Sequence, residues 1–301
     1  MQQLRESTCD YDSFVRDFCE LVEQMMGNEY STRIYKVIAN NSAESDSLVL
    51  FKSGSSFAPG IFLYPYYKEY LKGADICQLA AKVCDKYRSR ETAQKEEAFT
   101  YDFENIKDRI VYRLINYNRN RKLLEAVPHI KYMDLAVTYH CLFYRDDSGI
   151  SAIRITNDHL NLWKCSVKEL HPLAAKNTLR EFPPVISCMN DIIQKMFDRE
   201  NGEDDGCSSQ MYVLSNSIGV YGAACLLYKN LLRDFSAKHQ ADVFVLPSSI
   251  HELILIPDRG NVDRDELVKM VKSINRTHLA YDEVLSDRVY YYSRGYNAIM
   301  Q

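Results

Sequence analysis

The sequence lacks most of the short motifs by which metal proteins and nucleotide-dependent enzymes are recognised. None of its nine cysteines is spaced as CxxC, and no histidine pair follows a cysteine at zinc-finger spacing. Its 11 glycines form neither a GxGxxG nor a GxxxxGK[ST] loop. These absences argue against a zinc site, a Rossmann dehydrogenase and a nucleotide-driven motor. We therefore expect no metal and no cofactor.

Long apolar runs and an excess of positive charge are also missing. No stretch approaches the roughly 18 apolar residues that a membrane helix needs, and residues 1–12 lack the basic-then-apolar order of a secretion signal. The net charge of −4 argues against a chain that coats nucleic acid by bulk charge. An odd number of cysteines without pattern is typical of reduced thiols. We expect a cytoplasmic protein with no membrane partner.

The composition is that of an ordinary folded protein, with 46% hydrophobic and 26% charged residues. A chain of 301 residues is long enough for two domains. Apolar residues at three- and four-residue spacings predict helices, and short or alternating apolar runs predict strands. The first 90 residues accordingly predict a helix over 12–27, strands over 32–39 and 48–52, an edge strand or turn within 57–67, and a helix over 75–87.

The rest of the sequence mixes helices and hairpins without strict strand–helix–strand alternation. Strands are expected over 135–144, 151–156, 211–214, 242–246, 253–256 and 289–292, with helices beginning near 157, 166, 229 and 263. Residues 91–100 are charged without an apolar stripe and predict a linker. Residues 198–210 are acidic and rich in Gly and Ser, which predicts an exposed loop. We predict an α+β protein of two lobes, 1–90 and 101–301, each a small, mostly antiparallel sheet with packed helices.

A basic segment stands out after residue 100. Apolar residues at 106, 110, 114 and 117 recur at helical spacing and predict one long helix over about 103–127. Between residues 105 and 131 there are seven cations and two anions, a formal charge of +5. Interleaved tyrosines favour a surface for nucleic acid or an acidic protein, and a face that packs on the first lobe or is simply solvated is the alternative. The candidate binding residues are Arg109, Arg113, Tyr117, Arg119, Arg121 and Lys122.

The run LPSSIHE at 246–252 is the most site-like in the chain. Proline followed by two serines suits a tight turn between apolar strands. In an extended backbone Ser249 and His251 share one face, so with Glu252 they offer a hydroxyl, an imidazole and a carboxylate. The GxSxG elbow of many hydrolases is absent. We interpret the run as a structural hairpin first and as a catalytic cluster second.

Several short runs after residue 100 carry a resemblance to a known family. They are IKDRI (106–110), VPH (127–129), MDLAV (133–137), ITN (155–157), FPP (182–184), MYVL (211–214), GAA (222–224), LPSSIHE (246–252) and VLSD (284–287). In these runs, residues of about 100–292 resemble a bacterial protein family that has no assigned function and is often encoded on mobile elements. The resemblance implies no catalytic residues and adds cargo of a mobile element to the possible roles.

These features predict a non-enzymatic cytoplasmic protein that binds or regulates a macromolecule. The basic helix would engage a protein or a nucleic acid, for example as an inhibitor of a host defence or nuclease system. The competing class is a hydrolase built around Ser249, His251 and Glu252.

Overall fold

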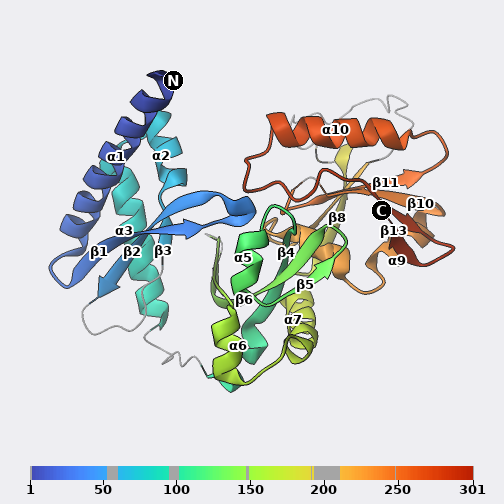
Figure 1. The fold of residues 1–301 in the computed structure, drawn as a ribbon, viewed down its shortest axis with the longest axis horizontal. Helices are drawn as coiled ribbons and strands as arrows, with labels where there is room; N and C mark the ends of the chain where they lie inside the picture. The colour runs from blue at the N-terminus through green and yellow to red at the C-terminus, as the bar shows by residue number, and fades with distance from the viewer. Residues whose placement is uncertain are drawn as a thin grey trace. The chain divides into compact units, whose positions relative to one another are not determined.

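The computed structural model describes residues 2–52, 60–94, 102–146, 149–190, 192, 211–247 and 249–300. The chain divides into two compact units. The first comprises residues 1–39 and 43–100, and the second comprises residues 40–42 and 101–301. Both units combine helices with antiparallel sheets (Figure 1). The predicted α+β fold class is therefore confirmed.

The first unit packs helices against a three-stranded antiparallel sheet. The strands, in sheet order, are β1 (Tyr30–Ile38), β2 (Glu44–Lys52) and β3 (Gly60–Phe62). The helices are α1 (Gln2–Met26), α2 (Tyr64–Leu71) and α3 (Ile76–Gln94), and α1 and α3 lie side by side in Figure 1. Phe18 and Val22 of α1 are buried in one core with Leu48 and Leu50 of β2 and Val83 of α3.

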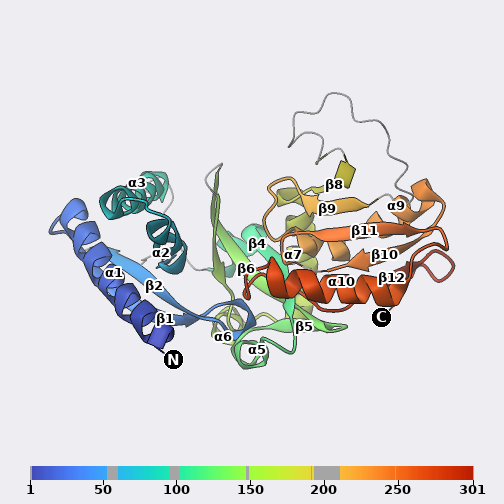
Figure 2. The ribbon, with the colours of Figure 1, turned by 90° about the horizontal axis from the view of Figure 1, so that it is seen from above.

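The second unit contains a six-stranded antiparallel sheet. In sheet order its strands are β13 (Ala298–Met300), β12 (Tyr290–Ser293), β10 (Asp242–Leu246), β11 (Leu253–Asp258), β9 (Tyr212–Asn216) and β8 (Pro184–Cys188). Helix α10 (Arg264–Thr277) runs across one face (Figure 2), where Leu267 and Val271 pack on Phe244 and Ile256. The 3-10 helix η3 (Gly222–Leu227) and α9 (Leu231–His239) contribute to the larger core that also holds Val243 and Val245.

A four-stranded antiparallel sheet forms the rest of the second unit. Its strands are β4 (Ile110–Asn116), β5 (His129–Tyr132), β6 (Leu135–Asp146) and β7 (Gly149–Arg154), with β6 pairing to the other three. Its helices are α4 (Phe103–Ile106), η2 (Lys107–Arg109), α5 (Arg121–Ala126), α6 (Asn157–Trp163) and α7 (Val167–Glu181). Tyr112, Leu114, Val137 and Tyr139 point from one face of this sheet into the same core as Val243 of the six-stranded sheet. Two sheets thus share one core.

The prediction of one long helix over about 103–127 is wrong. Only α4 and α5 at its two ends are α-helical, and strand β4 lies between them, paired with β6 from Ile110↔Cys141 to Asn116↔Leu135. The sequence IVYRLIN is apolar at nearly every position and rich in β-branched residues, which suits a strand buried on both faces. The four-residue spacing of the apolar residues 106, 110 and 114 is therefore a coincidence, because residues 110 and 114 belong to a strand and not to one face of a helix. The candidate binding residues therefore do not share the face of one helix.

Most other predicted elements are present with shifted ends. Helix α1 begins ten residues earlier than predicted and stops at Gly27, whose φ of +88° favours glycine. The capping box at Ser166 opens α7, as the sequence predicts. Residues 91–94 of the predicted linker end α3, and its residues 95–100 lie outside the described residues, as does the acidic segment 198–210.

Candidate functional site

One face of the four-stranded sheet carries charged and polar side chains where apolar ones would be expected. The register pairs Arg113 of β4 with Thr138 of β6, and His140 of β6 with Arg154 of β7. Residues two apart on a strand share a face, as do paired residues on neighbouring strands. Arg113, Thr138, His140 and Arg154 therefore lie on one face, opposite to the main core. We call Arg113, His140 and Arg154 the cationic belt.

Apolar clusters border the cationic belt at both ends. Ile115, Leu124 and Ala136 form one cluster, and Val111, Leu142 and Phe182 form the other. His140 and Thr138 are buried, and Arg113 and Arg154 are partly buried. Charged side chains are rarely held in such surroundings without a partner, because removing them from water is unfavourable.

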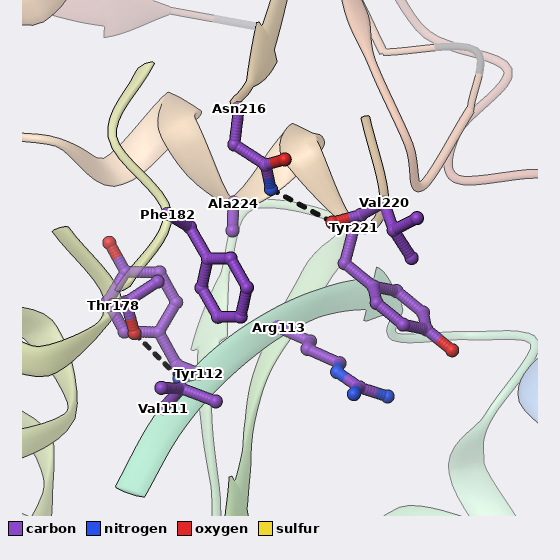
Figure 3. A pocket seen from close by; sticks show the side chains of 9 residues that line it. All are labelled: Val111, Tyr112, Arg113, Thr178, Phe182, Asn216, Val220, Tyr221 and Ala224. Carbon is purple, nitrogen blue, oxygen red and sulfur yellow. Dashed lines mark hydrogen bonds between the residues drawn. The ribbon is translucent and has the colours of Figure 1, made fainter. Parts of the chain in front are cut away.

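Arg113 has an aromatic partner. Its guanidinium carbon lies 3.7 Å from the centre of the Tyr221 ring, a cation–π contact. Figure 3 shows Arg113 leaving β4 with its guanidinium beside Tyr221 and away from Phe182, at a small pocket with room for about one water molecule. Among the described residues, Arg113 donates no hydrogen bond and pairs with no carboxylate. Burial lowers the pKa of Arg113, but a guanidinium stays charged in proteins.

The members of the cationic belt act on one another. Burial, followed by the charges of Arg113 and Arg154, lowers the pKa of His140 well below its usual 6.5. Burial and the charge of Arg113 also lower the pKa of Arg154, while Tyr221 acts in the opposite direction. His140 Nε2 lies 3.4 Å from the hydroxyl of Thr138. His140 is therefore neutral at pH 7 between two positive charges.

Ser249, His251 and Glu252 do come near one another, but in a turn held by backbone bonds. Ser249 Oγ accepts a hydrogen bond from the backbone N–H of His251 at 3.0 Å. The imidazole Nδ1 accepts one from the backbone N–H of Tyr221 at 3.2 Å, which leaves the proton of the neutral ring on Nε2, 4.0 Å from Glu283 Oε1. Burial lowers the pKa of His251, and the charges of Glu283 and Glu252 oppose that shift. Among the described residues no bond joins the Ser249 hydroxyl to the imidazole, as nucleophilic catalysis would require.

Three of the sequence runs that carry the resemblance meet around this turn. Ser249 bridges to Val284, and the backbone N–H of Ser286 donates to Pro247 O at 2.9 Å. The hydroxyl of Ser286 donates to Asp134 Oδ2 at 2.7 Å. The runs at 133–137, 246–252 and 284–287 are thus joined by hydrogen bonds, although they lie far apart in the sequence.

The other five predicted binding residues lie at three different places. Arg109 ends η2, Tyr117 and Arg119 lie in the turn after β4, and Arg121 and Lys122 begin α5. Arg119 Nη2 donates to Asp287 Oδ2 at 2.9 Å, and exposed Arg121 donates to Asn118 Oδ1 at 3.0 Å. Only Arg113 belongs to the cationic belt.

Sequence reasoning missed Thr138, His140, Arg154 and Tyr221. The available signal was the charged residue in the middle of the strand-like run IVYRLIN, which indicates a buried or functional arginine once the run is assigned as a strand. The described part of the chain contains no group of three His, Cys, Asp or Glu side chains able to hold a metal ion. Within the same residues, no helix has the length and apolar character needed to cross a membrane.

Residues 11–294 match a family of unknown function, DUF5688. The match covers nearly the whole chain, so the protein belongs to this family. It extends through both units, further toward the N-terminus than the runs after residue 100 indicated. No curated protein and no solved structure matches the chain.

Proposed function

We propose that this chain is a non-enzymatic binding protein whose second unit engages an acidic group of a protein partner through the cationic belt. The observation that supports the proposal is Arg113, which keeps its charge in a partly buried position, where the Tyr221 ring is its one charge-compensating contact among the described residues. A desolvated charge without a counter-ion is unfavourable, and an acidic group at this place would remove that cost. Arg is also enriched at the energetic centres of protein interfaces.

A protein partner fits the belt better than nucleic acid does. A nucleic-acid surface needs positive charges along many phosphates, with a strong salt dependence that reflects their number. The belt is compact and spans three adjacent strands, and the chain has a net charge of −4. These features suit recognition of one acidic group.

The cellular setting is a further part of the proposal. The seven cysteines whose side chains the structure describes are free thiols, which supports a reducing compartment such as the cytoplasm. The resemblance noted above supports a role as cargo of a mobile element, for example as an inhibitor of a host system. The binding partner would then be a host protein.

The experiment is a comparison of three baits in lysate from the native host. The baits are the wild-type chain, Arg113→Gln and Arg121→Gln, which loses the same charge from an exposed position on α5. The proposal expects a protein that wild type and Arg121→Gln retain in stoichiometric amount, that Arg113→Gln loses, and that elutes as salt rises. Retention by Arg113→Gln equal to that by wild type would overturn it, as would recovery of nucleic acid in place of protein.

A further inference from the structure

We propose that the chain forms a homodimer in which two copies of strand β1 pair antiparallel about a two-fold axis at Ile34. The three-stranded sheets of the two first units would then join into one continuous sheet. The inference goes beyond the proposed function, because it concerns the first unit and a second copy of the same chain. It is supported by the open edge of β1, by the side chains on that edge and by the position of Glu23.

β1 is an edge strand of the first sheet, and the backbone groups of every second residue face away from that sheet. In the part of the chain that the structure describes, β1 pairs only with β2. The N–H of Ala39 donates to Ala43 O at 2.8 Å and continues the β1–β2 register. Hydrogen-bonded pairs alternate along an antiparallel ladder, so the odd-numbered residues of β1 bond to β2. The N–H and C=O groups of the even-numbered residues therefore point to the free edge.

The free edge is capped at one end and open in the middle. The N–H of Thr32 donates to Glu23 Oε1 at 2.8 Å, and the Thr32 hydroxyl donates to the same oxygen. Among the described residues, the backbone N–H and C=O of Ile34 and Lys36 have no partner. An exposed strand edge of this kind is a template for a further strand.

Antiparallel pairing about Ile34 uses the open backbone groups. Each Ile34 N–H then donates to the Ile34 C=O of the other copy, and each Lys36 N–H donates to the Thr32 C=O opposite to it. The N–H of Thr32 needs no partner from the second copy, because Glu23 already accepts its proton. The capped end of each strand therefore marks where the new ladder stops.

The side chains on this edge are complementary to their own copies. Ile34 is 44% exposed and Tyr35 is 43% exposed, so two large side chains with apolar surface lie on the strand edge. Pairing about Ile34 sets the two Ile34 side chains against each other and places Arg33 opposite Tyr35 of the other copy. Arg33 lies 5.5 Å from the ring centre of Phe51, and the second ring gives it a further cation–π contact.

Charge complementarity favours a second copy over an unrelated strand. Lys36 of one copy lies opposite Thr32 of the other, because the two positions are equally far from Ile34 along the strand. Thr32 holds the carboxylate of Glu23 at this edge. Lys36 is exposed and has no ionic partner among the described residues. The two-fold axis therefore brings together two equivalent Lys36–Glu23 ion pairs.

The test is analytical ultracentrifugation of the full chain over a wide range of concentrations. We expect wild type to approach twice the mass of one chain as its concentration rises. Ile34→Lys sets two like charges directly opposite each other at the axis and should weaken the association at least tenfold. Leu71→Lys adds the same charge at a position of α2 that is 59% exposed, and it should associate as wild type does.

Two charge variants test the register of the pairing. Lys36→Glu places a carboxylate opposite Glu23 of the other copy and should weaken the association at least tenfold. Glu23→Gln in the same chain removes that repulsion and keeps an oxygen for the Thr32 N–H, so the double variant should regain most of the lost affinity. The association of wild type should also weaken as salt rises.

Circular dichroism establishes that each variant is folded, and the charge variants decide the question if Ile34→Lys does not fold. A wild-type chain that stays monomeric at every concentration would overturn the proposal and leave this edge to an acidic strand of another protein. Equal association of wild type and folded Ile34→Lys would also overturn it, as would equal weakening by Ile34→Lys and Leu71→Lys. Failure of Glu23→Gln to restore the association of Lys36→Glu would contradict pairing about Ile34.

Discussion

The guanidinium carbon of Arg113 and the ring centre of Tyr221 lie 3.7 Å apart, although 108 positions separate the two residues in the chain. Arg113 belongs to β4 of the four-stranded sheet, and Tyr221 directly precedes η3. The contact therefore joins two elements that the sequence gives no reason to connect. It also fixes the orientation of the one arginine on which the proposed function depends.

Tyr221→Leu should lower the free energy of unfolding by about 1–2 kcal/mol, because a partly buried cation–π contact is lost. Tyr221→Phe keeps the aromatic face and should stay within about 0.5 kcal/mol of wild type. Urea unfolding followed by circular dichroism measures both. Equal stabilities of the Leu and Phe variants would show that the ring face contributes nothing.

Acidification should destabilise the protein through His140. The folded state keeps this imidazole neutral because its pKa lies well below 6.5, whereas the unfolded chain takes up a proton near that pH. The contribution of neutral His140 to the free energy of unfolding is fully present above pH 6.5. It is lost as the pH falls below that value, with a slope of about 1.4 kcal/mol per pH unit for one proton.

Melting temperatures measured between pH 7.5 and 5 test this expectation. Wild type should lose stability across the acid half of the range, and His140→Gln should show a shallower dependence. His278→Gln, at an exposed position, is the matched control and should follow wild type. A pH profile of His140→Gln identical to that of wild type would contradict the expectation.

Asn41 should be one of the most sensitive polar positions. It is buried, its backbone is left-handed at φ 58°, and its Nδ2 donates to the carbonyls of Tyr281 and Val284 at 2.8 and 2.7 Å. Asn120 Nδ2 donates to its Oδ1 at 3.1 Å. Asn41→Ala leaves these groups unpaired and should cost about 2–4 kcal/mol.

Asn41→Gly separates the two causes. It loses the same hydrogen bonds but relieves the left-handed backbone, so it should be about 1 kcal/mol more stable than Asn41→Ala in chemical denaturation. If Asn41→Ala unfolds at the same denaturant concentration as wild type, the buried hydrogen bonds do not hold this segment.

Gly222 should tolerate no side chain. A Cβ there would lie 2.5 Å from His251 O and 2.8 Å from Asn216 N, and both are backbone atoms that cannot turn away. Gly222→Ala should cost about 2 kcal/mol or more. Gly295→Ala, where the nearest atom is 3.8 Å away, should change stability by less than about 0.5 kcal/mol in the same thermal melts. Equal melting of the two variants would contradict the close packing.

Local patterns predicted most of the elements and little of the site. The helix stop at Gly27, the capping box at Ser166 and strand β10 follow from chemistry within a few residues, and the structure contains all three. β4 was misassigned because a strand buried on both faces has no alternation to reveal its period. That single error placed Arg113 on the face of a helix and not on a strand in the middle of a sheet, where it is partly buried.

The site depends on contacts between distant segments of the chain, and the spacing of residues in the sequence does not predict such contacts. Arg113 meets His140 and Arg154 only through the register of β4, β6 and β7, and it meets Tyr221 only through the packing of η3. Long-range strand register follows from tertiary packing and not from a local pattern. Ser249 and His251 lie in one turn, where the backbone N–H of His251 donates to the Ser249 hydroxyl.

The most direct test of the central claim is the affinity of the purified partner for wild type, Arg113→Gln and Arg121→Gln, measured in one buffer by calorimetry. All three chains should give the folded circular dichroism spectrum. The account predicts that Arg113→Gln binds at least tenfold more weakly than wild type, while Arg121→Gln binds within twofold of it. Equal affinities of wild type and folded Arg113→Gln would contradict a function based on the cationic belt.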